Sequence, residues 1–160
     1  MGVFFSGKEL IGIAIGIEKN GVAFYDSLAS SAKDVTAQDT YKYLADRERE
    51  HIQIFQNMLG SVGDYQPPET YTEEYARYLR GLVDSAVFAD DKVAREMAEK
   101  VTSTAEAIQI GLRAEKDSIL FYLEMQNLVR SSDRGVVNKI IEEERSHVRQ
   151  LLSLRHSLGK

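Results

Sequence analysis

The sequence predicts an all-α protein, a four-helix bundle in which a long crossover joins the second helix to the third. Two observations predict this fold. Proline occurs only at Pro67 and Pro68, so most of the 160-residue chain is free to be helical. Apolar residues recur at helical spacing in four long stretches, and a segment that begins at Glu18 is repeated from Glu115. The bundle is therefore expected to consist of two similar helical hairpins.

The first hairpin is predicted from a capping box and two apolar stripes. Ser6 and Glu9 form the capping box, which predicts a first helix at about 7–31. Its stripe consists of Leu10, Ala14, Ile17, Gly21, Phe24 and Leu28. A second helix is predicted at about 36–59, starting near Thr36 and ending near Gly60 or Gly63, which suit a left-handed C-cap. The short link at about 32–35 makes the two helices antiparallel.

The second hairpin follows the same plan. Ser103 and Glu106 predict a second capping box and a helix at about 104–129. The fourth helix is expected to follow Ser132 or Asp133 and to occupy about 133–158.

The segment at about 60–103 is long enough to cross back along the bundle. Two short helices are predicted within it, near 73–82 after Thr70 or Thr72 and near 91–100 after Asp90. The whole chain, 1–160, is expected to be a single domain.

Composition excludes several kinds of site and partner. The chain has no cysteine, which excludes disulfides, zinc–thiolate sites and iron–sulfur clusters. The formal net charge of −5 argues against nucleic acid and against an anionic membrane as partners. The sequence has no apolar run of the length that a membrane span needs, and its N-terminus lacks the pattern of a secretory signal. A cytoplasmic location is therefore expected.

Two Glu-x-x-His triplets are the strongest functional signal. Glu48 and His51 form the first, Glu144 and His147 the second, and together they use two of the three histidines in the chain. Residues three apart are neighbours on a helix surface, so each triplet presents a carboxylate and an imidazole side by side. Either triplet alone is typical of a solvated helix face. The pair becomes informative because of a second repeat.

The second repeat supplies two further carboxylates. The octapeptide that starts at Glu18 matches the one that starts at Glu115 at four of eight positions. Glu18 precedes Glu48 by 30 residues, and Glu115 precedes Glu144 by 29. Each hairpin thus contributes one lone glutamate and one Glu-x-x-His triplet. All four glutamates lie on apolar stripes, where an uncompensated charge is costly to bury.

Two divalent cations would cancel the four glutamate charges, with the neutral imidazoles of His51 and His147 as additional ligands. Mixed oxygen and nitrogen ligation suits iron or manganese, and this ligand pattern is that of di-iron and di-manganese carboxylate bundles. The predicted metal ligands are Glu18, Glu48, His51, Glu115, Glu144 and His147. The predicted cofactor is a pair of iron ions, with manganese as the alternative and with no haem or iron–sulfur cluster.

These motifs resemble those of rubrerythrin-type ferritin-like proteins without a rubredoxin domain. The resemblance implies that Glu48 and Glu144 bridge the two irons and that Glu18 and Glu115 are terminal ligands. It further implies a peroxide-reducing enzyme, a homodimer and an external electron donor such as a separate rubredoxin. One departure is that rubrerythrins carry an additional glutamate where this chain has Ser118. Asp117 and Glu124 lie on the opposite side of the helix and cannot replace it.

Several assignments stay open from the sequence. The substrate is peroxide or dioxygen, and the alternatives are a ferroxidase or iron-handling protein and a bundle that the metal only stabilises. Tyr25 and Tyr122, seven residues after Glu18 and Glu115, are either donors to the ligands or ordinary core aromatics. Charges near the triplets are expected on the surface, with only Glu144 of its acidic run pointing inward. These surface residues are Asp46, Glu142, Glu143 and His156, and the alternative for Asp46 and Glu142 is that they orient the ligands by hydrogen bonds.

Overall fold

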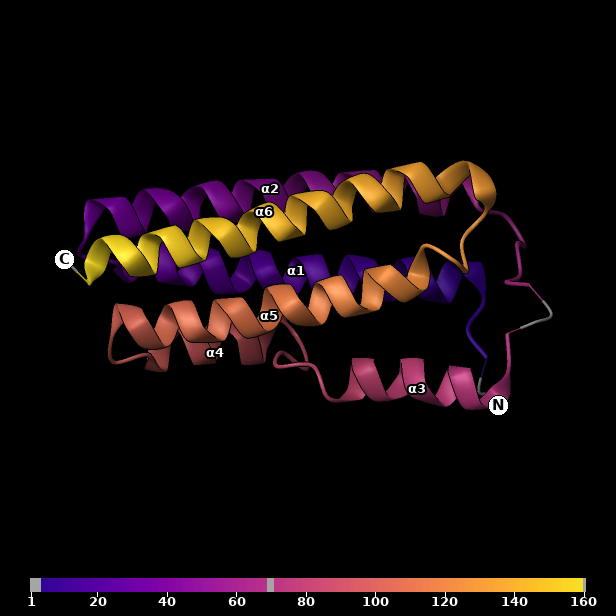
Figure 1. Cartoon of the computed structure of the whole chain (residues 1–160), viewed down its shortest axis with the longest axis horizontal. Helices are drawn as coiled ribbons and strands as arrows, with labels where there is room; N and C mark the ends of the chain where they lie inside the picture. Colours follow the sequence, from indigo (N-terminus) through magenta and orange to yellow (C-terminus); the bar gives the residue numbers. More distant parts are fainter. Residues whose placement is uncertain (1–3, 69–70, 160) are drawn as a thin grey trace.

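The computed structural model describes residues 4–68 and 71–159, and all regular structure in them is helical (Figure 1). The elements are α1 (Gly7–Ser31), α2 (Val35–Ser61), α3 (Glu73–Asp84), α4 (Asp91–Lys100), α5 (Thr104–Met125), a short 3₁₀ helix (Ser131–Asp133) and α6 (Arg134–Leu158). The four long helices match the four that the sequence predicts. The prediction of an all-α four-helix bundle is confirmed.

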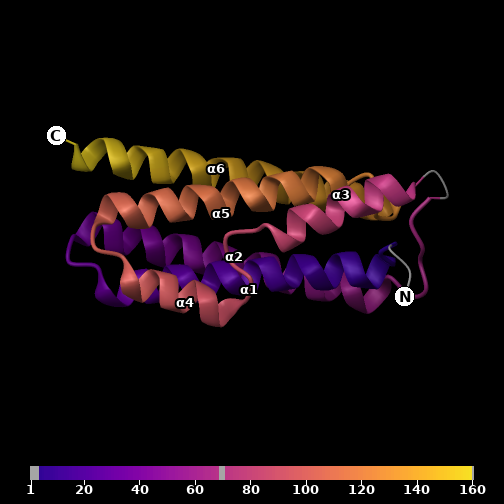
Figure 2. The same cartoon turned by 90° about the horizontal axis from the view of Figure 1, so that it is seen from below.

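The long helices form two antiparallel pairs. α1 packs mainly against α2, and α5 packs mainly against α6. In Figure 1, α2 and α6 lie along one side of the bundle and α1 and α5 along the other. The crossover helices α3 and α4 run along the α1–α5 side, with α3 beside one half of the bundle and α4 beside the other (Figure 2). The predicted crossover along the bundle is present.

Side-chain caps explain where most helices begin. Ser6 and Glu9 form the complete capping box that the sequence predicts for α1. Asp34 caps α2 by accepting from the amide of Ala37, two residues before the predicted start. The second predicted capping box is only half formed, because Ser103 accepts from the amide of Glu106 while the Glu106 carboxylate accepts from Thr102. Within the crossover, Thr72 and Asp90 cap α3 and α4. Thr70, the alternative start for the first of these, lies outside the described residues.

The third long helix ends earlier than predicted. α5 stops at Met125, whereas the sequence pattern extends to about 129. The amides of Leu128 and Val129 both bond to the carbonyl of Met125, so the chain turns while both side chains remain buried. Apolar periodicity alone cannot separate this buried turn from a further turn of helix. Arg130 then fixes the turn by donating to the carbonyl oxygen of Ser61 at 2.7 Å.

The core consists of two apolar clusters, one toward each end of the bundle. The first surrounds Leu10, Phe55, Phe121 and Ile140. The second surrounds Phe24, Leu44, Ile108 and Leu151. The middle of each long helix lies between the clusters, and the buried charged side chains are found there. The fold therefore buries the polar centre in the middle of the bundle, remote from both ends.

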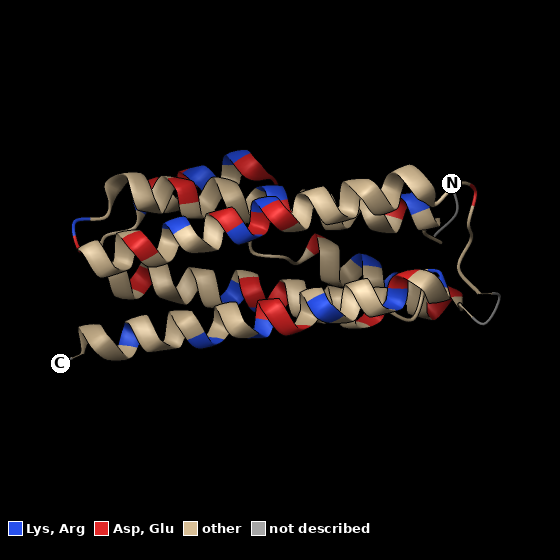
Figure 3. Ribbon diagram, turned by 90° about the horizontal axis from the view of Figure 1, so that it is seen from above, with Lys and Arg blue, Asp and Glu red and all other residues tan. Residues whose placement is uncertain are grey.

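The surface carries both signs of charge. Lys and Arg are interspersed with Asp and Glu along the helices (Figure 3). None of the described helices is both long and apolar enough to cross a membrane. Among the aromatic side chains of the crossover, Tyr71 and Phe88 are buried within the chain, while Tyr78 is exposed. The homodimer stays a prediction.

Candidate metal centre

The six predicted ligands meet in the middle of the bundle. Each of the four long helices contributes, since α1 and α5 supply one glutamate each and α2 and α6 supply one Glu-x-x-His triplet each. Every one of the six residues is at most 3% exposed. The six residues are Glu18, Glu48, His51, Glu115, Glu144 and His147.

The six residues form two overlapping groups of potential ligand atoms. One group consists of Glu18, Glu48, His51 and Glu144, and the other of Glu48, Glu115, Glu144 and His147. Within each group the ligand atoms all lie within 4.8 Å of one another. Glu48 and Glu144 belong to both groups, and each has two oxygens to share. The arrangement therefore suits two ions that are bridged by two carboxylates.

Unpaired buried atoms show that the residues fit such ions. His51 Nδ1 lies 2.9 Å from Glu144 Oε1, and His147 Nδ1 lies 3.1 Å from Glu48 Oε1. Nevertheless both ring nitrogens, and both oxygens of Glu144, lack a hydrogen bond. The distances are short enough for hydrogen bonds, but the angles between donor and acceptor are not suitable for them. Buried polar atoms without partners are costly, and a cation between them would satisfy all of them.

The electrostatics of the metal-free centre are unfavourable. Burial, and then the charge of Glu144, raise the pKa of Glu115 to about 8. Burial and the charge of Glu48 likewise raise the pKa of Glu18 well above its usual range. Burial lowers the pKa of His51 and His147, but the surrounding carboxylates outweigh it, so both values are raised. Without metal, the centre therefore holds protons in place of cations.

Two tyrosines hold the terminal glutamates, each from the opposite hairpin. Tyr25 on α1 donates its hydroxyl to Glu115 Oε1 at 2.5 Å. Tyr122 on α5 donates to Glu18 Oε1 in the same way. Burial, and then the neighbouring carboxylates, raise the pKa of both tyrosines well above the usual range, so both stay neutral donors. Close packing supports this pair, because a Cβ at Gly111 would lie 3.3 Å from the Tyr25 hydroxyl.

Removal of either hydroxyl should affect one metal position and spare the other. Tyr122→Phe leaves an oxygen of Glu18 without its donor, and loss of such an outer partner typically weakens metal affinity about 10–100-fold. The weakened position should be the one that contains Glu18 and His51. Tyr25→Phe is the matched control, since it should weaken the position of Glu115 and His147. Anaerobic calorimetry with Fe(II) measures the two affinities. Equal weakening of both positions by either variant would contradict the assignment.

Glu143 supports one histidine, a role that the sequence analysis missed. Its Oε2 lies 2.8 Å from His51 Nε2 and also accepts from Arg47 at 2.7 Å. This contact directs the other ring nitrogen of His51 toward the carboxylates. In the described part of the chain, the carboxylates near His147 all lie on its Nδ1 side. The two metal positions therefore differ in the support of their imidazoles.

The variant Glu143→Ala should weaken binding at the position that contains His51 by about 10–100-fold. The reason is that His51 loses the acceptor that fixes its orientation. Glu142→Ala is the control, because Glu142 is exposed and its ion pair among the described residues is with Arg145. Two-step Fe(II) binding curves test this prediction. Unchanged binding in Glu143→Ala, or an equal loss in Glu142→Ala, would show that Glu143 does not position the imidazole.

The other residues considered from the sequence have different roles. Asp46 and His156 are exposed, as predicted, and Asp46 pairs with Arg49. Asp117 accepts from the amide of Val87, and Glu124 accepts from the hydroxyl of Tyr75. Ser118, at the place of the additional rubrerythrin glutamate, donates to the carbonyl of Ala114 at 3.0 Å. The prediction was therefore wrong only for Glu143, which points inward beside Glu144.

Comparison with known proteins agrees with this geometry. The sequence matches the rubrerythrin family over residues 9–155. A crystal structure from Thermotoga maritima, described as a candidate ferritin-like diiron-carboxylate protein, is 29% identical in sequence. The similarity covers 96% of each chain with a TM-score of 0.70, which confirms the ferritin-like form of the bundle. Among curated proteins, no sequence match is found. With nearly the whole chain matched, and with two buried Glu/His clusters that are consistent with a diiron site, this protein belongs to the rubrerythrin family.

Proposed function

We propose that this protein is a di-iron oxidoreductase that reduces hydrogen peroxide or dioxygen and so acts in defence against oxidative stress. The observation that carries the proposal is the pair of buried groups that share Glu48 and Glu144. Two ions at these positions would lie side by side, where one small molecule with an O–O bond can reach both. A purely structural site does not need such a shared position.

The donor set favours iron, with manganese as the alternative. Each group offers carboxylates from three glutamates and one imidazole nitrogen. Oxygen and nitrogen donors without thiolates suit these metals. The four glutamates carry the charge that two divalent ions neutralise, so loading would also remove the repulsion that raises the pKa of Glu18 and Glu115.

The protein's contribution is to hold this geometry and to bury the ligand side chains. Tyr25 and Tyr122 hold the terminal carboxylates through their hydroxyl protons. Glu143 holds His51. The apolar clusters on both sides leave the ligand side chains buried, which strengthens electrostatic interactions among them.

When bound, a pair of ferrous ions supplies the two electrons that cleavage of an O–O bond requires. Reduction of one peroxide to two waters consumes two electrons and two protons, so a reductant must restore the ions after each turnover. The chain has no cysteine and hence no rubredoxin-type centre. The proposed donor is therefore a separate protein, such as a rubredoxin, or a small reductant.

Ser118 favours a second candidate, a ferroxidase that oxidises Fe(II) with dioxygen and passes it on. The additional glutamate of rubrerythrins is absent, and the Ser118 hydroxyl donates to the carbonyl of Ala114. The centre thus has six protein ligands arranged with approximate symmetry. Such a centre lacks the feature that sets rubrerythrins apart for peroxide.

Rapid mixing separates these functions. Protein loaded anaerobically with Fe(II) is mixed either with stoichiometric hydrogen peroxide or with air-saturated buffer, and oxidation is followed by absorbance. Much faster oxidation by peroxide supports the peroxidase. Fast oxidation by air, with uptake that continues beyond two irons per chain, supports the ferroxidase. Slow oxidation by both would contradict either enzyme and favour a metal that only stabilises the bundle.

A further inference from the structure

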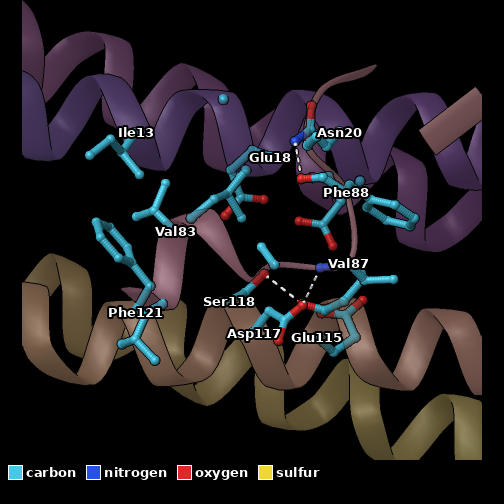
Figure 4. A pocket seen from close by; sticks show the side chains of 18 of the residues that line it. Ile13, Glu18, Asn20, Val83, Val87, Phe88, Glu115, Asp117, Ser118 and Phe121 are labelled. Carbon is cyan, nitrogen blue, oxygen red and sulfur yellow. Dashed lines mark hydrogen bonds between the residues drawn. The ribbon is translucent and has the colours of Figure 1, made fainter. Parts of the chain in front are cut away.

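A cavity of about 230 Å³ opens directly onto the metal centre. It lies between α1 and α5, and the crossover covers it from the end of α3 to Ala89 (Figure 4). Glu18, Glu48 and Glu115 form part of its wall. The bundle is open here because α1 and α5 contact each other little, whereas each packs extensively against its hairpin partner.

The cavity is much larger than peroxide or dioxygen requires. About 10–15 Å³ of such volume is enough for one water molecule, and a cavity of about 150 Å³ binds benzene. By the same scale, about 230 Å³ accommodates a molecule of about nine non-hydrogen atoms. A centre that handled only small oxygen species would have no use for this space.

The lining is mainly aliphatic and aromatic. Apolar side chains come from both helices and from the crossover, among them Ile13, Ile17, Leu82, Val83, Val87 and Phe121. Figure 4 shows Ile13, Val83 and Phe121 on one side of the cavity and the carboxylates of Glu18 and Glu115 farther along it. The cavity therefore has an apolar body and one charged end.

The other polar side chains in the wall already have partners within the chain. Asp117 accepts from the amide of Val87 at 2.8 Å, and Asn20 donates to the carbonyl of Phe88 at 3.4 Å. Ser118 donates within its own helix. These bonds hold the crossover over the cavity, so the groups that make them are not available to a ligand. The remaining charged groups in the wall are the three carboxylates at the metal centre.

Small residues keep the way to the metal centre open. The third position after each terminal glutamate faces the cavity and is occupied by Gly21 or Ser118. A Cβ at Gly21 would lie 3.2 Å from Cγ of Glu48, so a larger side chain would press on a bridging ligand. Both positions that could close the cavity against the metals are therefore small.

We propose that this cavity is a binding site for an unbranched aliphatic molecule of about nine non-hydrogen atoms with a single polar end, which lies at the metal centre. An apolar chain fits the lining, and one polar group fits the end formed by the carboxylates of Glu18, Glu48 and Glu115. The position of the polar end rests on the metal centre proposed above. Binding of the apolar chain depends only on the cavity.

The test uses 1-octanol, which has nine non-hydrogen atoms, and follows the methyl groups of Ile13 and Val83 by NMR. Both metal-free protein and protein loaded with Zn(II), which is redox-inert, are titrated. We expect saturable shifts of these methyl groups in both forms. The diol 1,8-octanediol should bind at least about tenfold more weakly, because its second hydroxyl is buried without a partner.

Variants that fill the cavity provide the control. Ser118→Leu fills it from α5, and Val83→Phe fills it from the crossover side, away from the metal ligands. Both should lose the response to 1-octanol, which in Val83→Phe is followed at Ile13 alone, while retaining two Zn(II) per chain. Ser118→Ala leaves the space open and should bind 1-octanol as the unmodified protein does.

The results separate this inference from the proposed function. Two metals per chain and peroxide turnover, together with no methyl shifts on addition of 1-octanol, would overturn the ligand site alone. Shifts that persist in both filled variants would also overturn it, since binding would then lie elsewhere. Failure to bind two metals would refute the proposed function, whereas loss of octanol binding in the filled variants would still establish the apolar site.

Discussion

The Glu144→Ala variant should lose tight binding at both metal positions, whereas Glu18→Ala should lose it at only one. Glu144 belongs to both groups of ligand atoms, and Glu18 belongs only to the group that contains His51. A position that loses one carboxylate keeps only three protein ligands and should no longer bind tightly, and loss of the shared Glu144 does this to both positions at once. The expected stoichiometries are two tight sites for the unmodified chain, one for Glu18→Ala and none for Glu144→Ala.

Anaerobic Fe(II) titration of the three proteins measures these numbers. Glu115→Ala is the matched partner of Glu18→Ala and should retain the other position. Circular dichroism checks that every variant is folded, which is expected because a buried carboxylate among like charges is removed. Retention of one tight site in Glu144→Ala would contradict the bridging role.

Metal loading should stabilise the protein more at pH 8 than at pH 6. In the metal-free protein, Glu115 has a pKa of about 8, compared with 4.5 for an ordinary glutamate. Between these two pH values the folded protein holds a proton on Glu115 that the unfolded chain has lost. The free energy of unfolding therefore falls as the pH rises from about 4.5 to 8. The slope for one such group is about 1.4 kcal/mol per pH unit. The raised pKa of His51 and His147 acts in the same direction above pH 6.5.

Cations replace these protons, so metal binding becomes tighter as the pH rises. A ligand at about 1,000 times its dissociation constant stabilises the folded state by about 4 kcal/mol, which corresponds to about 8–16 °C in Tm for a chain of this size. Thermal unfolding with chelator and with excess Mn(II), at pH 6 and pH 8, measures both effects. A metal-free protein that is no less stable at pH 8 than at pH 6 would contradict the protonated centre.

The helical core of the site could be predicted from sequence because helices convert spacing into geometry. Residues three apart share a helix face, so Glu48 with His51 and Glu144 with His147 were placed correctly by spacing alone. The repeat that contains Glu18 and Glu115 then indicated a second pair of helices with the same orientation. Charges on apolar stripes supplied the reason for metal.

Contacts between helices could not be predicted in this way. Glu143 is next to a ligand in sequence, but its partner His51 is on another helix, and only the packing of α2 against α6 brings the two together. Each tyrosine donates to the glutamate of the other hairpin, and this likewise depends on the distance between α1 and α5. One signal was available for Tyr25 and Tyr122, since both follow their glutamate by two helical turns.

The cavity depended on the crossover, whose position no periodic pattern specifies. Two long-range hydrogen bonds, from the amide of Val87 to Asp117 and from Asn20 to the carbonyl of Phe88, hold this segment over α1 and α5. The sequence predicted two short helices there but not the side of the bundle on which they lie. The cavity, in contrast to the spacing of the metal ligands, is therefore a property of the tertiary structure.

The central claim is that two metal ions share Glu48 and Glu144. Crystals soaked anaerobically with Fe(II) and measured at the iron absorption edge would locate the ions directly by anomalous scattering. We predict two peaks per chain, one between Glu18 and His51 and the other between Glu115 and His147, with Glu48 and Glu144 contacting both ions. A single peak, or iron bound only at the surface, would contradict the dinuclear centre.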